Sequence, residues 1–134
     1  MARSIAGLAE RQGHFFLAKR KPGGDLAHKW ELPGGKLEKG ETAEEAMIRE
    51  WLEELEIQVQ VGPLLSSGHF THKDTLFLLE MYHVEFKGDP KALHEHVEWG
   101  WFSPEEINSL DLAGSDRIVL SEYMKEVRMD SKLS

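Results

Sequence analysis

The chain has 134 residues, of which 40% are hydrophobic and 30% charged, a composition typical of one soluble globular domain. Its formal net charge of −8 argues against nonspecific binding to nucleic-acid polymers and to anionic membranes. It contains no cysteine, which excludes disulfides, thiol nucleophiles and zinc–thiolate sites.

The predicted elements mix strands and helices along the whole chain. The dipeptide Gln12-Gly13 predicts a hairpin between the first two strands, and capping-box signals predict helices that begin after Thr42 and after Ser103. The expected strands cover 4–10, 14–19, 30–32, 57–65, 75–86 and 99–102, and the expected helices cover 42–55, a short segment from 103 and about 116–127. This order predicts a single α/β domain over 1–134, a three-layer α/β/α sandwich with a mixed central sheet and a frayed tail over 129–134.

No targeting or membrane segment is visible in the sequence. The N-terminal stretch MARSIAGLAERQGHFF lacks the apolar run of a signal peptide, and no segment is apolar enough over a sufficient length to span a bilayer. We therefore expect a cytoplasmic protein with no membrane partner, acting as a monomer or a homodimer.

An acidic cluster stands out in the helix predicted after Thr42. At about 100° per residue, Glu50, Glu53 and Glu54 fall within one arc, separate from the apolar arc. Crowded carboxylates repel one another, and a divalent cation removes that repulsion. Hard cations such as Mg²⁺ prefer oxygen ligands and are commonly shared with substrate phosphates. A solvated acidic face is the alternative interpretation.

The spacing around this cluster resembles the Nudix box, the signature of hydrolases that act on a nucleoside diphosphate linked to another group. The matching positions are, in order, Gly35, Glu41, Arg49, Glu50, Glu53, Glu54 and the apolar Ile57. One position departs from the pattern, because Glu56 stands where the family has glycine. Glycine suits a helix end with positive φ, so we expect the helix of this chain to run one residue further.

The resemblance is strongest to the MutT-like branch, and it implies a metal shell and its ligands. In that branch a carbonyl of the glycine pair joins the metals, which points to Gly34 and, as second choice, Gly35. Glu50 and Glu54 are implied as side-chain ligands. Glu53 is implied either to bind a second metal or to take a proton from the attacking water.

The resemblance also implies supporting roles outside the acidic cluster. Arg49 and the loop residue Glu41 orient a carboxylate in the family. A further carboxylate precedes the Trp-bearing strand, and Glu95 matches it better than Glu98 does. The nearby pair His94 and His96 invites a zinc interpretation. Histidines at alternate strand positions are more often surface residues, however, and no third ligand is evident.

Several residues are candidates for substrate binding. Arg20 ends the second strand, where MutT-like enzymes carry basic residues near the nucleotide, and a solvated strand end is the alternative. Trp30 and Leu32 precede the glycine turn of Gly34, so Trp30 either lines the pocket or belongs to the core. Asp116 matches a base-reading position of the branch, or else it caps the last helix.

Together these observations predict a Mg²⁺-dependent hydrolase, with Mn²⁺ as a substitute ion. The expected reaction converts a nucleoside triphosphate, of the oxidised purine or pyrimidine type, to the monophosphate and pyrophosphate by water attack at phosphorus. The alternatives are another nucleoside-diphosphate-linked substrate (a dinucleoside polyphosphate, ADP-ribose or a nucleotide sugar) and a nucleotide-sensing module without activity.

Overall fold

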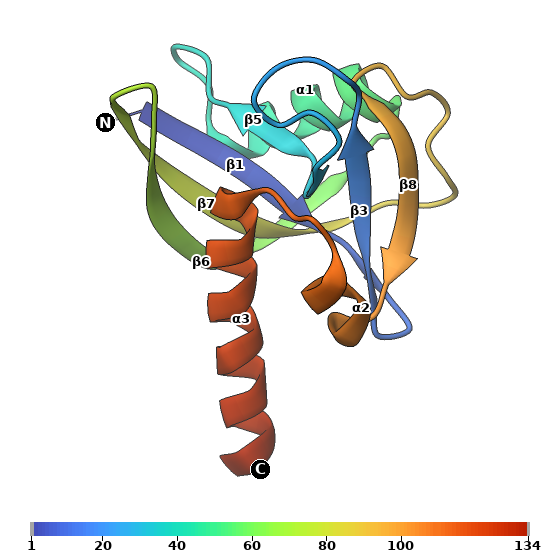
Figure 1. Cartoon of the computed structure of the whole chain (residues 1–134), viewed down its shortest axis with the longest axis vertical. Helices are drawn as coiled ribbons and strands as arrows, with labels where there is room; N and C mark the ends of the chain where they lie inside the picture. The colour runs from blue at the N-terminus through green and yellow to red at the C-terminus, as the bar shows by residue number, and fades with distance from the viewer. Residues whose placement is uncertain (1, 134) are drawn as a thin grey trace.

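The computed structural model describes the backbone of residues 2–133 and the side chains of residues 2–127. Strands and helices follow one another in much the expected order (Figure 1). The strands are β1 (Ala2–Leu8), β2 (Glu10–Arg11), β3 (His14–Arg20), β4 (Trp30–Glu31), β5 (Gly34–Lys36), β6 (Gln60–His72), β7 (Thr75–Glu85) and β8 (His96–Phe102). The helices are α1 (Ala43–Leu55), α2 (Pro104–Ser109) and α3 (Gly114–Leu133). In the described part of the chain, no helix has the length and hydropathy needed to cross a membrane.

The strands form two sheets. The larger sheet is mixed, with the order β5-β1-β7-β6, and β1 runs parallel to β7 but antiparallel to β5. In the smaller, antiparallel sheet β3 is bordered by β2, β4 and β8. The expected mixed α/β fold is thus confirmed, with its strands divided between two sheets.

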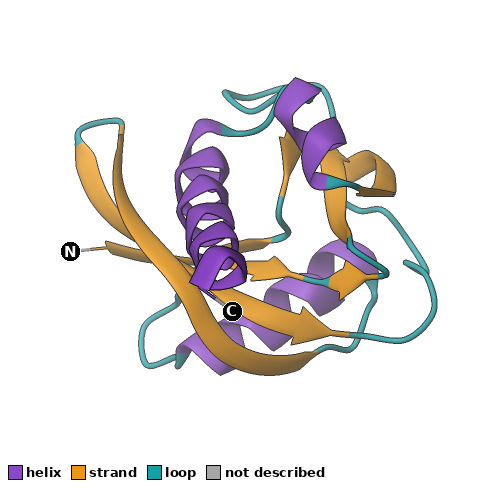
Figure 2. Cartoon of the chain, turned by 90° about the horizontal axis from the view of Figure 1, so that it is seen from below, coloured by secondary structure: helices purple, strands orange, loops and turns teal. Residues whose placement is uncertain are grey.

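The period of two along each strand separates two hydrophobic cores. On β1 and β3, Ile5 and Phe16 face the core under α1, whereas Ala6 and Leu17 face the core under α2 and α3. Figure 2 shows the two long helices on opposite sides of the larger sheet. This arrangement gives the three layers that the sequence predicted.

The first predicted hairpin is present, but one of its two strands differs from the one expected. The turn lies at Gln12 and Gly13, which both have positive φ, but the strands that pair across it are β2 and β3. β1 belongs to the larger sheet, and the buried Ala9 separates it from β2. A change of sheet depends on distant strand partners, so the local turn signal did not reveal it.

The end of α1 corrects the expectation for Glu56. The helix stops at Leu55, and Glu56 adopts the left-handed conformation with φ 52°. The buried Ile57 donates its N–H to the carbonyl oxygen of Trp51 at 3.4 Å, which closes the helix end. The Glu56 carboxylate lies 2.7 Å from His94 Nε2. Burial of Ile57 therefore fixes a conformation that a non-glycine residue adopts at a cost of roughly 1 kcal/mol.

The last helix also begins earlier than expected. α3 starts at Gly114, which places Asp116 inside the first turn and excludes it as the helix cap. The backbone is helical to Leu133. The frayed tail expected over 129–134 is tested by no further observation and stays a prediction.

Candidate active site

Close approach of neighbouring atoms, backbone at Gly34 and a side chain at Gly35, explains both glycines. β5 pairs with β1 through Gly34 and Gly35, opposite Ala6 and Ile5. A Cβ atom on Gly34 would lie 2.0 Å from the Ile5 carbonyl oxygen, and one on Gly35 would lie 2.6 Å from the Glu50 carboxyl carbon. Glycine at these positions lets the turn lie directly against the Glu50 carboxylate.

The six predicted metal-shell residues line one cleft. We call it the carboxylate cleft; it has a volume of about 300 Å³ and is lined by Arg20, Gly34, Gly35, Glu50, Glu53, Glu54 and Glu95. Glu50, Glu53 and Glu54 come together because they lie on one arc of α1, and the segment before β8 supplies Glu95. Lys21 Nζ lies 3.4 Å from Glu95 Oε2.

Arg49 connects the carboxylates of the loop and the helix. Its guanidinium donates to both oxygens of Glu41, at 2.6 and 2.9 Å, and to Glu50 Oε1 at 2.7 Å. It also reaches Glu53 Oε2 at 3.3 Å. The hydrogen bonds from Arg49 and then from the backbone of Glu38 lower the pKa of Glu41 to about 2. Arg49 and Glu41 thus lie where they can fix the direction of Glu50.

Glu54 is a buried carboxylate without compensation. Neither of its oxygens has a hydrogen-bond partner among the described residues, and the residue is only 4% exposed. Burial, followed by the nearby charges of Glu31 and Glu50, raises its pKa to about 10. Unpaired buried carboxylates are costly unless a cation or a proton compensates them. The free oxygens of Glu54 and the neighbouring oxygen donors therefore suit a hard divalent cation.

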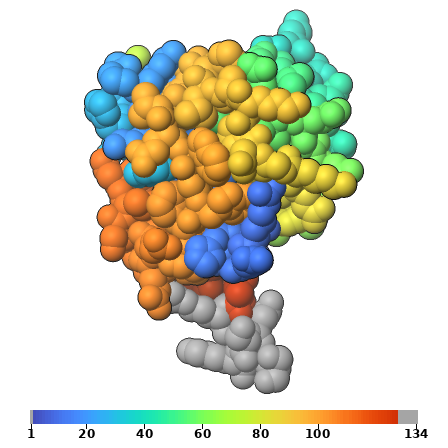
Figure 3. Space-filling model, turned by 90° about the vertical axis from the view of Figure 1, so that its right-hand side faces the viewer, coloured from blue at the N-terminus to red at the C-terminus, as the bar shows by residue number. Residues whose placement is uncertain are grey.

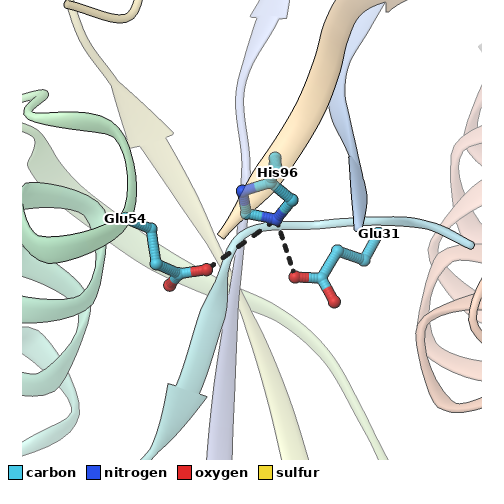
Figure 4. A group of neighbouring side chains, drawn as sticks. All are labelled: Glu31, Glu54 and His96. Carbon is cyan, nitrogen blue, oxygen red and sulfur yellow. Dashed lines mark hydrogen bonds and ion pairs between the residues drawn. The ribbon is translucent and has the colours of Figure 1, made fainter. Parts of the chain in front are cut away.

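Behind Glu54 lies a pair of residues that the sequence did not identify as functional, Glu31 on β4 and His96 on β8 (Figure 4). His96 Nε2 lies 3.0 Å from Glu31 Oε2 and 3.9 Å from Glu54 Oε1. The expectation of a surface histidine is wrong for His96, whose side chain is 0% exposed. The available signal was a single charged residue, Glu31, between Trp30 and Leu32 in an apolar strand.

A second, larger cleft adjoins the first. We call it the apolar cleft; its volume is about 620 Å³, and it shares Arg20, Gly34 and Gly35 with the carboxylate cleft. Its wall includes Leu26, Glu31, Leu32, Phe70, Phe77, Leu79, Asp116 and Ile118. This volume suits a small organic ligand.

Three predicted substrate-binding residues lie at the apolar cleft beside Gly34, and one does not. Arg20, Leu32 and Asp116 line it, whereas Trp30 is buried in the core with its ring 4.9 Å from that of Phe102. Asp116 Oδ2 accepts a hydrogen bond from the Leu32 N–H at 2.9 Å. Burial and then the charge of Glu31 raise the pKa of Asp116 to about 8.

The loop before β8 is tied to the end of α1. His94 N–H donates to the Glu54 carbonyl oxygen at 2.9 Å, and the N–H groups of Lys91 and Ala92 donate to that of Leu55. Figure 3 shows the yellow-to-gold loop running beside the green helix. These bonds place Glu95 and His96 next to the acidic face of α1.

Comparisons with known proteins agree with this arrangement. The sequence model of a family described as NUDIX domain matches residues 1–123. A CTP pyrophosphohydrolase of Escherichia coli (strain K12) is 37% identical over 125 residues, which cover 92% of each chain. An 8-oxo-dGTP diphosphatase of the same organism is 29% identical over 119 residues, covering 88% of this chain and 92% of the relative. Among solved structures, the MutT protein from Methanosarcina mazei Go1 has a TM-score of 0.84 at 27% identity, with 93% of this chain and 94% of that chain covered.

Proposed function

The chain belongs to the Nudix family, and from this premise we propose that it hydrolyses a nucleoside triphosphate to the monophosphate and pyrophosphate, with Mg²⁺ as its cofactor. The observation that carries the proposal is the junction of two clefts. The carboxylate cleft holds the uncompensated Glu54, and the apolar cleft beside it has the volume of a small organic ligand. A triphosphate spanning the junction would place its base in the apolar cleft and its phosphates near the carboxylates.

The oxygen donors of the carboxylate cleft suit the proposed ion. Glu50 and Glu54 would hold it, with the carbonyl oxygen of Gly34 or Gly35 and the carboxylate of Glu95 as further donors. A bound divalent cation supplies charge neutralisation for phosphates and lowers the pKa of coordinated water. Arg49 keeps Glu50 turned toward the cleft, and Glu41 in turn holds Arg49.

Glu53 is the best placed of the helix carboxylates to accept a proton from water. Its side chain is 58% exposed, compared with 17% for Glu50 and 5% for Glu54. Its contact with Arg49, at 3.3 Å, is also the longer of the two that Arg49 makes with Glu50 and Glu53. It can therefore turn toward a water molecule at phosphorus without losing a buried partner.

Arg20 and Asp116 would divide the recognition of the nucleotide. Arg20 lines both clefts, so its guanidinium can contact a phosphate while the base occupies the apolar cleft. Asp116 and Leu32 lie on the wall of the apolar cleft, and a carboxyl oxygen of Asp116 would accept a hydrogen bond from an exocyclic amine. The two Escherichia coli relatives, a CTP pyrophosphohydrolase and an 8-oxo-dGTP diphosphatase, support a pyrimidine or an oxidised purine as the base.

A hydrolysis screen tests the proposal. The full chain, with and without Mg²⁺, is incubated with nucleoside triphosphates including CTP and 8-oxo-dGTP, and with dinucleoside polyphosphates, ADP-ribose and nucleotide sugars. We expect metal-dependent release of pyrophosphate from a triphosphate and its loss in Glu53→Gln. Faster turnover of another class would reassign the substrate, and binding without turnover would identify a nucleotide sensor.

A further inference from the structure

Glu31, Glu54 and His96 meet at the wall between the two clefts. They come from β4, α1 and β8, and one atom of each lies within 4.8 Å of the others (Figure 4). Glu54 lines the carboxylate cleft and Glu31 lines the apolar cleft. The group therefore borders both clefts, although all three residues are buried.

The polar atoms of this group are not satisfied by the protein alone. Both Glu54 oxygens and His96 Nδ1 lack a hydrogen-bond partner among the described residues. Two carboxylates share the group, and the guanidinium of Arg20 forms an ion pair with Glu31, at 3.7 Å. Unpaired buried charge of this kind is costly, and a divalent cation bound to both carboxylates would compensate it.

The spacing of the three atoms fits a first-row metal ion. With metal–ligand bonds of about 2.1 Å, neighbouring ligands lie about 3.0 Å apart in an octahedral shell and about 3.4 Å apart in a tetrahedral one. His96 Nε2 lies 3.0 Å from Glu31 Oε2 and 3.9 Å from Glu54 Oε1. Small side-chain adjustments would bring all three to bonding distance.

The nitrogen donor selects the kind of ion. Mg²⁺ prefers a shell of oxygen atoms, whereas imidazole suits divalent transition metals. We propose that Glu31, Glu54 and His96 form an inner cation site that takes a divalent transition-metal ion, such as Mn²⁺, Co²⁺ or Zn²⁺, in preference to Mg²⁺. The inner site shares Glu54 with the carboxylate cleft, whereas Glu50, Glu53 and Glu95 belong to that cleft alone.

The inner site is tested by binding, so it stands or fails separately from the proposed hydrolysis. The full chain is treated with chelator and titrated with Co²⁺ while visible absorption and the proton NMR spectrum are followed. We expect a ligand-field band and a hyperfine-shifted, exchangeable ring N–H resonance from a coordinated histidine. A Co²⁺-bound wild-type chain without such a histidine signal would overturn the proposal, and this measurement needs no variant.

A pair of histidine variants assigns the ligand. His96→Gln removes the imidazole, and His94→Gln is the matched control because His94 lies two residues away with its side chain 53% exposed. In calorimetric titrations we expect His96→Gln to weaken Co²⁺ binding by more than about tenfold, and to change Mg²⁺ affinity by less than roughly threefold. His94→Gln should leave both affinities and the histidine signal unchanged.

A third variant separates the inner site from the carboxylate cleft. Glu53→Gln should weaken Mg²⁺ binding while the Co²⁺ histidine signal persists. Equal losses of Co²⁺ and Mg²⁺ affinity in His96→Gln would overturn the proposal, since His96 would then only support the fold of the carboxylate cleft. Retention of the histidine signal in His96→Gln would overturn it as well.

Discussion

The Arg49 guanidinium forms a two-pronged pair with the Glu41 carboxylate, with Nε donating to Oε2 at 2.6 Å and Nη2 to Oε1 at 2.9 Å. Glu41 comes from the loop before α1, whereas Arg49 lies on α1 beside Glu50 and Glu53. A bidentate pair fixes both the position and the orientation of a guanidinium. Glu41 therefore fixes the position from which Arg49 contacts Glu50 and Glu53 in the carboxylate cleft.

We predict that Glu41→Gln reduces kcat by about 10- to 100-fold, the usual cost of losing a residue that orients metal ligands. One oxygen acceptor remains in glutamine but the charge is lost, so Arg49 can turn toward Glu50 and Glu53. Steady-state pyrophosphate release at saturating Mg²⁺ measures the effect. Glu38→Gln is the control, because Glu38 lies 3.7 Å from Arg49 with its side chain 68% exposed. Equal rates for the Glu41 variant and the wild type would contradict the orienting role.

Substitutions of the two glycines of the turn should have different effects, one on folding and the other on metal binding. A Cβ on Gly34 meets the Ile5 carbonyl oxygen, which belongs to the backbone, whereas a Cβ on Gly35 meets the movable side chain of Glu50. We predict that Gly34→Ala lowers the free energy of unfolding by about 3 kcal/mol or more, as strong overpacking does. Gly35→Ala should have an unfolding midpoint closer to that of the wild type than Gly34→Ala has, but it should bind Mg²⁺ weakly. Urea unfolding and calorimetry distinguish the two, and a reversed pattern would refute the assignment.

Local signals in the sequence located the acidic helix well. The Thr42 side chain accepts from the Glu45 N–H as the capping box requires, and the helical period alone places Glu50, Glu53 and Glu54 on one arc. Such features depend on residues a few positions apart, so spacing is enough to predict them. The resemblance to a known family supplied Glu41 and Glu95, which periodicity could not connect to the helix.

The buried group of Glu31 and His96 could not be predicted in this way. β3 pairs on one edge with β4, where Ala18 is opposite Glu31, and on the other edge with β8, where Arg20 is opposite His96. The two residues are 65 positions apart in sequence and meet only because both strands border β3. Long-range register of this kind leaves no local periodicity, so an isolated His-x-His pattern predicts only a surface feature.

Because Glu54 is buried, we predict that metal binding changes the stability of the fold. In chelator at neutral pH, the wild type must bury Glu54 either as an unpaired carboxylate or with a proton taken up on folding, whereas Glu54→Gln needs neither. We expect the variant to be more stable than the wild type by about 1–3 kcal/mol in the absence of metal, the range for burying an unpaired polar group. Added Mg²⁺ should raise the melting temperature of the wild type by more than that of the variant. An equal gain in both proteins would exclude Glu54 as a ligand.

Asp116 predicts a dependence of stability on pH. The pKa is raised from 3.8 in the unfolded chain to about 8 in the fold, so between these values the native state holds a proton that the unfolded state has lost. The free energy of unfolding contributed by this group therefore falls as pH rises from about 4 to about 8. Asp116→Asn keeps an oxygen for the Leu32 N–H and cannot ionise. Urea unfolding at pH 5 and pH 8 should show a smaller decrease in the variant, and an equal decrease in both proteins would contradict the raised pKa.

Replacing Glu56 by the family glycine should stabilise the protein. Glu56→Gly relieves a left-handed conformation that costs a side chain roughly 1 kcal/mol. It also removes the pairing with His94, but both side chains are about half exposed, and such pairs contribute only a few tenths of a kcal/mol. The net gain in the free energy of unfolding should therefore be about 0.5–1 kcal/mol. Glu56→Ala is the matched control, because it loses the pair and keeps the strain, and it should destabilise the chain slightly in the same urea titration. If the glycine variant were no more stable than the alanine variant, backbone strain would not govern this helix end, and an equal loss of stability in both variants would assign the effect to the pairing with His94.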